Sequence, residues 1–181
     1  MPSFVAVALE GDFLERLPEI ARACGCEPVG TVQLFTNWTS VAPFARRTDY
    51  LTAAISGKWT VLMDDWNVTD YLFDHPEVCA DLAKRYRVRV ASAFAQSVSG
   101  GCGYRVHNRS GARARSVAVL QDEVLENLGK PLPGEDTSDL EQHDMFSVLD
   151  VLGLIGLDVA DGVEASTRCA MLQLASKSGQ P

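Results

Sequence analysis

The sequence predicts an α+β fold: a mostly antiparallel, twisted sheet of five to eight strands, packed with about three helices. Two observations lead to this prediction. Short apolar runs of strand type recur along the chain, most clearly in residues 50–63 and 87–120. Apolar residues with helical spacing recur near residues 12–25, 75–86 and 139–153. The 181 residues include 46% hydrophobic side chains, which suits one domain with a sizeable core. We therefore expect a single domain over residues 1–181, with a polar tail at about 176–181.

The first elements lie before residue 50. Residues 3–9, SFVAVAL, are β-branched and apolar and predict a buried strand. In the next segment, apolar residues recur at helical spacing between Asp12, a suitable N-cap, and Gly25, a suitable stop. Pro18 lies inside this pattern, so the helix is either kinked or begins later. Residues 31–36 predict a second strand, and a loop follows.

The central region changes to a period of two. YLTAAIS and WTVLMD flank Gly57–Lys58, a gap of hairpin size. Residues 75–86 predict a helix. After it, RVRVASAFA, GYRVHN and ARARSVAVL predict three strands of an antiparallel meander, with its tightest turn at residues 108–111.

The C-terminal third is less regular. EVLENL fits either a strand or a short helix, and GKPLPGEDTSD is a loop rich in turn residues. Residues 138–141, SDLE, match a capping box before a helix at about 139–153, which would bury Met145 or Phe146. TRCAMLQL predicts the last strand before the polar tail.

Composition bears on location and redox state. No apolar run approaches the roughly 20 residues that span a bilayer, and the N-terminus lacks the basic region of a signal peptide. We therefore expect a cytoplasmic protein without membrane association. The five cysteines form an odd number without framework spacing, so they are interpreted as reduced thiols.

Positive charge is concentrated in one segment. The formal net charge is −8, yet residues 84–115 carry eight basic side chains and no acidic one. If the meander strands pair in order, residues two apart share a face, and Arg105, His107, Arg113 and Arg115 form a candidate anion-binding surface. Three interpretations stay open: a solvated or internally paired face, a site for an acidic protein or small anion, and a nucleic-acid site. The acidic remainder of the chain would repel a long polyanion, so nucleic acid is the least favoured partner.

A second candidate surface combines aromatic and acidic residues. WTVLMDDWNVTDYLFDHPE begins with Trp59, which alternates with Val61 and fits the core. The residues after the strand are candidates for contact with a basic partner protein, because aromatic anchors dominate interface energies: Asp64, Asp65, Trp66, Asp70 and Tyr71. The alternative is that this segment packs over the sheet edge.

Known catalytic patterns do not occur in the chain. Gly129–Lys130 is followed by Pro131, so there is no P-loop, and no Gly-x-Ser-x-Gly elbow occurs. Cys24 and Cys26 are one residue closer than in the usual Cys-x-x-Cys knuckle and have no second pair, so Cys102 or His107 would have to complete a zinc site through the fold. Asp64 and Asp65 form the most enzyme-like feature, without partner carboxylates at a known spacing. We therefore predict no catalytic residue, no cofactor and no metal; enzymatic activity is less favoured than binding.

The order of the features is similar to that of a known class of proteins. GKPLPGE followed by an acidic helix and LGLIGL, with the strands before them, resembles short, acidic, uncharacterised bacterial α+β proteins, some of which are immunity partners of secreted toxins. The resemblance covers roughly residues 57–160 and assigns no functional residue. It implies a non-enzymatic binding protein, of which the immunity type is one case. The net charge then favours capture of a basic protein through acidic segments 64–81 or 135–144. The alternative is a small enzyme or sensor that binds an anionic small molecule on the arginine-rich face.

Overall fold

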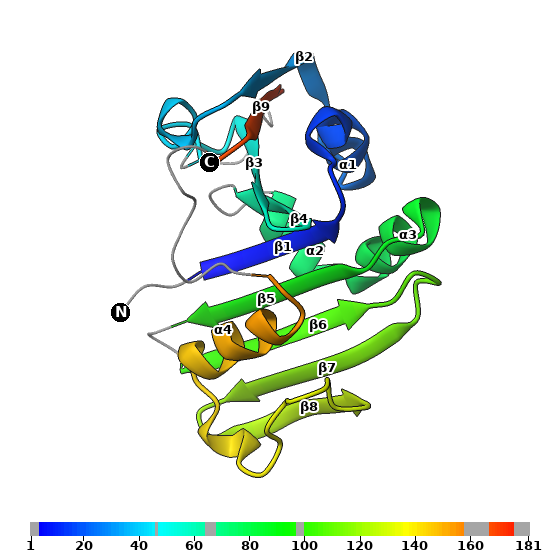
Figure 1. The fold of residues 1–181 in the computed structure, drawn as a ribbon, viewed down its shortest axis with the longest axis vertical. Helices are drawn as coiled ribbons and strands as arrows, with labels where there is room; N and C mark the ends of the chain where they lie inside the picture. The colour runs from blue at the N-terminus through cyan, green and yellow to red at the C-terminus, as the bar shows by residue number, and fades with distance from the viewer. Residues whose placement is uncertain (1–3, 46, 64–67, 97–99, 158–166, 176–181) are drawn as a thin grey trace.

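A computed structural model describes residues 4–45, 47–63, 68–96, 100–157 and 167–175 of the chain. The α+β class is confirmed: the strands form one sheet in the order β2-β9-β3-β4-β1-β5-β6-β7-β8, and every neighbouring pair is antiparallel (Figure 1). The nine strands are β1 (Phe4–Glu10), β2 (Pro28–Phe35), β3 (Tyr50–Ser56), β4 (Trp59–Met63), β5 (Val90–Gln96), β6 (Gly101–His107), β7 (Arg113–Leu120), β8 (Glu123–Gly129) and β9 (Cys169–Leu174).

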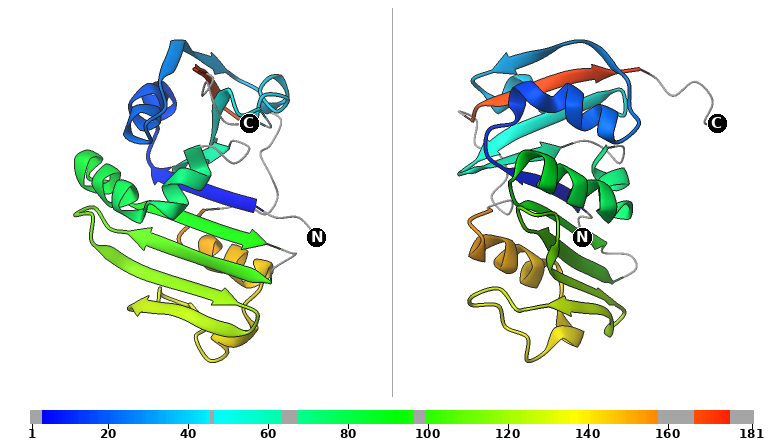
Figure 2. Two further views of the ribbon diagram at one scale, coloured as in Figure 1. Left: turned by 180° about the vertical axis from the view of Figure 1, so that it is seen from behind. Right: turned by 90° about the vertical axis from the view of Figure 1, so that its right-hand side faces the viewer.

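Helices cover both faces of the sheet (Figure 2). One face carries α1 (Leu17–Ala23), α2 (Val68–Asp74) and α3 (Pro76–Tyr86), whose buried residues pack in one hydrophobic cluster. The other face carries α4 (Met145–Leu154), which packs in a second cluster with Trp59 and Tyr104. Three short 3₁₀ helices complete the described elements: η1 (Leu14–Arg16), η2 (Trp38–Ser40) and η3 (Leu140–Gln142).

The central strands are buried on both faces because a helix layer lies on each side. Along β1, Val7 and Leu9 enter the cluster under α1–α3, whereas Ala8 enters the cluster under α4. This alternation follows from the period of two in a strand. Continuous apolar runs such as SFVAVAL are therefore compatible with a central antiparallel strand.

The predicted count of five to eight strands is one too low. EVLENL, which fitted a strand or a helix, forms the edge strand β8 and brings the number to nine. The hairpin at Gly57–Lys58 is confirmed, with Ser56 opposite Trp59. The meander is also confirmed, and β8 extends it to four strands.

Two helices differ from the prediction. The segment after β4 was assigned to no element, but it contains α2, whose seven residues are too few to display a clear helical period. The helix expected at 139–153 is divided: η3 covers 140–142, His143 is extended, and α4 begins at Met145. Asp144 caps α4 and accepts a hydrogen bond from the Ser147 N–H at 2.9 Å. The capping box that begins the helix is therefore Asp144 with Ser147, and not the predicted one at 138–141.

The first helix resolves an open alternative. It begins late, at Leu17, with Pro18 in its first turn, where a proline costs no hydrogen bond. Among the described residues, no helix is both long and apolar enough to cross a membrane.

Candidate functional site

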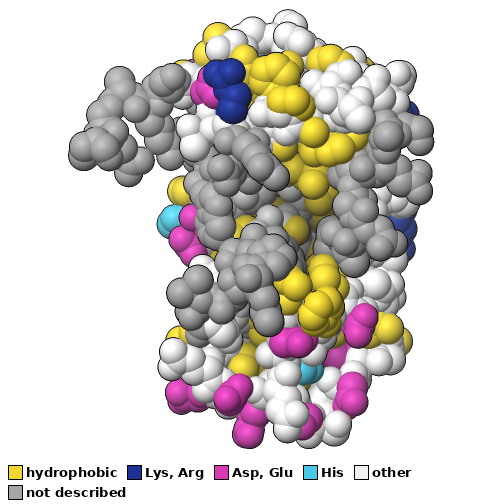
Figure 3. Space-filling model, turned by 90° about the vertical axis from the view of Figure 1, so that its left-hand side faces the viewer, with side chains coloured by type: hydrophobic (Ala, Val, Ile, Leu, Met, Phe, Trp, Pro, Cys, Tyr) yellow, Lys and Arg dark blue, Asp and Glu magenta, His cyan; other side chains and the backbone are white. Residues whose placement is uncertain are grey.

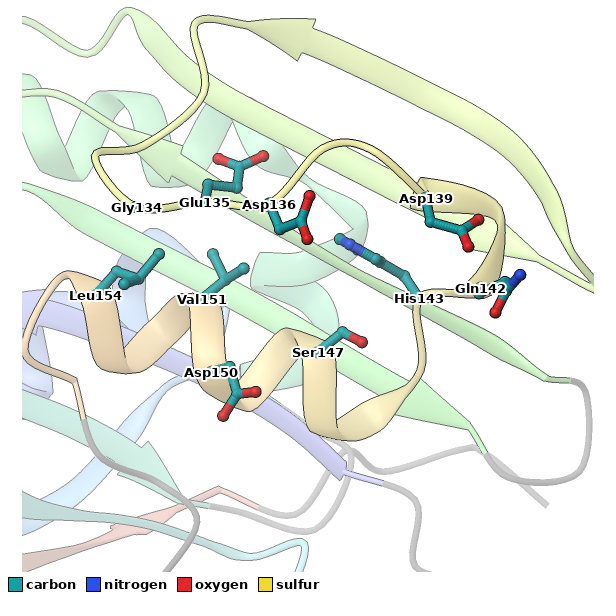
Figure 4. Close-up of a pocket in the computed structure, with 10 residues that line it drawn as sticks. All are labelled: Gly134, Glu135, Asp136, Asp139, Gln142, His143, Ser147, Asp150, Val151 and Leu154. Atoms are coloured by element: carbon teal, nitrogen blue, oxygen red, sulfur yellow. The ribbon is translucent and has the colours of Figure 1, made fainter.

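A groove lies between α4 and the segment that follows β8 (Figure 4). Its cavity volume is about 420 Å³. The loop side contributes most of the polar groups, and none of the described lining residues is Lys or Arg. The lining consists of Gly134, Glu135, Asp136, Asp139, Gln142, His143, Ser147, Asp150, Val151 and Leu154.

A buried ion pair fixes the loop side of the groove. The Arg115 side chain on β7 is 1% exposed and that of Glu135 is 0% exposed, and their charged groups form a hydrogen-bonded ion pair. Arg115 Nη1 also donates to Asn127 Oδ1 at 2.7 Å, and Glu135 Oε2 accepts the Leu132 N–H at 2.7 Å. Burial raises the pKa of Glu135, but hydrogen bonds from Arg115 and from the Leu132 N–H help to outweigh it, so the pKa is lowered and the pair stays ionised.

Three exposed carboxylates line the groove: Asp136, Asp139 and Asp150. None makes an ion pair with a residue that the structure describes. Asp136 Oδ1 accepts hydrogen bonds from the Ser138 side chain at 2.7 Å and backbone at 2.9 Å, which lower the pKa of Asp136. The His143 side chain lies beside Asp136 (Figure 4), and its buried Nδ1 has no hydrogen-bond partner among the described residues. The groove therefore presents uncompensated negative charge.

The predicted basic face is only partly formed. Arg105, His107 and Arg113 share the face of the sheet that carries α3, but Arg115 lies on the opposite face beneath the groove loop. A β-bulge in β7 is the reason: Val106 is opposite Arg115, and His107 is opposite Arg113, so two residues of β7 correspond to one of β6. The extra residue reverses the direction of one arginine.

The arginines on the α3 face are engaged within the protein. Glu126 lies 2.6 Å from Arg113 and 3.6 Å from Arg105, oxygen to nitrogen. Arg105 also donates to the Phe73 carbonyl at 2.8 Å and lies over the Phe73 ring. His107 is 2% exposed; burial, with the charges of Arg113 and Arg105, lowers its pKa to about 4. Anion binding by these residues stays a prediction.

Two further basic residues of segment 84–115, Arg89 and Arg109, form ion pairs with Glu10. Arg89 binds the Glu10 carboxylate with two nitrogens at 3.0 and 3.2 Å, Arg109 binds it at 3.3 Å, and Lys58 lies 3.6 Å away. The hydrogen bond from Arg89 contributes most to lowering the pKa of Glu10, to about 2. Arg87 is not in a strand as predicted, because it ends α3 in a left-handed conformation.

The aromatic–acidic segment is described only in part. Asp64, Asp65 and Trp66 lie outside the described residues. Asp70 and Tyr71 belong to α2, where both are half-buried, and the Tyr71 ring packs against His75 with centroids 4.1 Å apart. Contact of these residues with a partner stays a prediction.

The five cysteines are buried and form no disulfide within the described part of the chain. Burial raises the pKa of Cys79 to about 12 and that of Cys102 to about 11, so these thiols are poor nucleophiles. Within the described ranges, no group of three or more His, Cys, Asp or Glu side chains is placed to hold a metal ion.

Sequence reasoning located the acidic segment 135–144 but not the groove. It missed the helix side, Ser147, Asp150 and Leu154, and the acids that neutralise the arginines, Glu126 and Glu135. Glu126 could be identified as an arginine partner only if EVLENL was known to be a strand paired with β7. Glu135 could be identified only if the register of that strand pair was known. No protein-family model, curated protein or solved structure matches the chain.

Proposed function

We propose that the protein is a non-enzymatic binding protein that holds a basic segment of a partner protein in the groove between α4 and residues 134–143. One observation carries the proposal: three exposed carboxylates line a cavity whose described lining includes no lysine or arginine. A cationic side chain of a partner would supply the missing charge. Complementary charge of this kind accelerates association and favours a basic partner over an acidic one.

The internal pairing of the arginines supports the same proposal. Arg115 is bound by Glu135, and Arg105 and Arg113 share Glu126. These three arginines of the basic segment are thereby engaged within the fold, whereas the groove acids make no ion pair with a described residue. The competing hypothesis, an enzyme or sensor with an anion on the arginine-rich face, loses Arg115 and retains two arginines that already hold a carboxylate.

The proposed chemistry fits an immunity-type protein that neutralises a basic toxin by covering its surface. Such a protein needs a stable scaffold, a charged recognition surface and no catalytic group. The sheet with helices on both faces serves as the scaffold, and the groove serves as the recognition surface. The partner is defined here by its chemistry: a protein with exposed arginine or lysine side chains.

The experiment compares two triple variants in affinity capture from the source lysate after nuclease treatment. The groove variant is Asp136→Asn with Asp139→Asn and Asp150→Asn. The control variant removes three exposed acids that do not line the groove: Glu15→Gln, Glu27→Gln and Asp81→Asn. We expect one basic protein to be retained by wild type and control at low salt and lost by the groove variant.

High salt should release that partner, because exposed charges are screened over about 8–10 Å at physiological ionic strength. Retention of the same protein by the groove variant would contradict the proposal. Equal loss from both variants would assign the binding to net charge alone, and the groove would have no special part in it.

A further inference from the structure

The outer face of α4 is unusually apolar for a helix on a protein surface. Its ten residues, MFSVLDVLGL, include a single charged side chain. At 3.6 residues per turn, the buried Val148, Val151 and Leu152 point toward the sheet, and Phe146, Asp150 and Gly153 point away from it. Phe146 is 64% exposed and Leu154 is 46% exposed. A helix that packs on one side only normally presents polar residues on the other.

The structure decides between the two residues that the sequence offered for burial, Met145 and Phe146. Met145 is partly buried, and Phe146 is exposed. The reason is the cap at Asp144, which sets the helix start. Figure 3 shows hydrophobic side chains on this side of the molecule next to a group of acidic side chains.

Gly153 supplies an independent observation. A Cβ added at this residue would have no neighbouring atom within 4 Å, so the fold itself does not require a glycine here. Glycine inside a helix is less favourable than alanine. A missing side chain on an exposed helix face lets another backbone approach closely. Gly153 lies on the same helical face as Phe146. A second backbone that approaches Gly153 would therefore lie near an exposed aromatic anchor.

The charge on this face selects the partner. Asp150 lies four residues from both Phe146 and Leu154, so the face has an acidic group between two apolar ones, spaced over about 12 Å. Asp150 also lines the groove with Asp136 and Asp139. A complementary surface has a basic side chain between two apolar ones. A second copy of α4 does not fit, because its own Asp150 would be repelled.

We propose that the partner docks an amphipathic basic helix across the outer face of α4, a statement that rests on the proposed function above. The partner backbone passes close to Gly153, its apolar side chains pack against Phe146 and Leu154, and its arginine or lysine side chains reach Asp150 and the groove. This is the helix-in-groove mode of recognition, in which apolar anchors supply affinity and charge supplies selectivity.

The test uses two synthetic peptides of identical Leu, Arg and Ala composition. In one, leucines recur at helical spacing with arginines between them; in the other, the same residues are scrambled so that no apolar face forms. Binding is measured by fluorescence anisotropy with wild type, with the triple groove variant and with three single variants. Gly153→Gln blocks close approach, Phe146→Ser removes an anchor, and Leu128→Ser is the control at an exposed apolar residue on β8.

We expect the helical peptide to bind wild type at least about tenfold more tightly than the scrambled one, and Gly153→Gln and Phe146→Ser to remove about that difference. Leu128→Ser should bind like wild type, and the thermal midpoints of Gly153→Gln and Phe146→Ser should not fall. The single variants keep all groove carboxylates, so they test the helix face alone.

Three results would overturn the inference. Equal binding of both peptides, lost only with the three groove asparagines, would leave the proposed function standing and remove the helix face from it. Weak binding of both peptides that the groove asparagines do not change would overturn both. Self-association of wild type that Gly153→Gln abolishes would assign the face to a second copy of this chain.

Discussion

Two charged regions of the molecule differ in how far their charges are paired within the fold. The basic segment 84–115 lies mostly in the meander, and several of its cations are bound by acids from distant parts of the chain: Glu10, Glu126 and Glu135. The acidic segment 134–150 keeps Asp136, Asp139 and Asp150 exposed around a cavity. The main concentration of positive charge in the sequence therefore belongs to the region where charge serves the fold. A binding surface is better indicated by charge that the fold leaves uncompensated.

The largest expected effect separates two arginines that lie two residues apart. Arg115→Met leaves the buried Glu135 carboxylate without its partner and should lower the free energy of unfolding by about 3–5 kcal/mol. Arg113→Met is the matched control. The Arg113 side chain is 37% exposed and Glu126 keeps Arg105, so the loss should stay below about 1 kcal/mol. Urea unfolding of both variants measures the difference.

Equal losses in the two variants would show that the bulge does not divide the arginines as described. A double change, Arg115→Met with Glu135→Leu, should recover much of the stability, because it removes both buried charges together. Failure to recover would mean that the loop depends on other contacts of Glu135, such as its hydrogen bond from Leu132.

The next effect concerns His107, a buried neighbour of two paired arginines. Its pKa is about 4 in the folded protein and 6.5 as the ordinary value, so the unfolded chain binds more protons between these pH values. Stability should therefore decrease as the pH falls from 6.5 toward 4, by about 2 kcal/mol between pH 7 and pH 4.5. Urea unfolding at pH 7 and pH 4.5 measures this loss. In His107→Leu that part of the pH dependence should disappear; an unchanged slope would assign it to other groups.

The local parts of the fold followed from the sequence, and the pairings between distant segments did not. The β3–β4 hairpin and the β5–β7 meander have short connections and period-two patterns, so their signals lie within a few residues. Segment α2 was missed because seven residues with a β-branched start show too little helical periodicity. The strand order places β9 between β2 and β3, an arrangement that no local pattern encodes.

The candidate site likewise has features that are visible in the sequence and features that depend on strand pairing. The acidity of segment 135–144 is visible in the sequence. The position of Arg115 is not, because it depends on a bulge within β7 and on Glu135, 20 residues later in the chain. Arg89 and its partner Glu10 are 79 residues apart. A strand register that changes by one residue reverses a side chain, so neither the basic face nor the groove could be derived before the pairing was known.

The smallest expected effect on stability belongs to the groove. Changing Asp136, Asp139 and Asp150 together to asparagine should alter the free energy of unfolding by no more than about 0.5 kcal/mol per site, since surface changes away from paired groups are usually this small. Asparagine Oδ1 can still accept the hydrogen bonds from Ser138. At low salt the variant should be slightly more stable than wild type, because three like charges no longer repel each other.

Urea unfolding at low and high salt checks both the size and the sign of this effect. A gain that vanishes at high salt fits exposed carboxylates that are kept at a small cost in stability, as a binding surface requires. A loss above about 1 kcal/mol per site would instead show that the carboxylates hold the 134–143 segment in place. The two charged regions would then serve the fold alike, and the contrast between Arg115 and the groove acids would no longer locate a binding site.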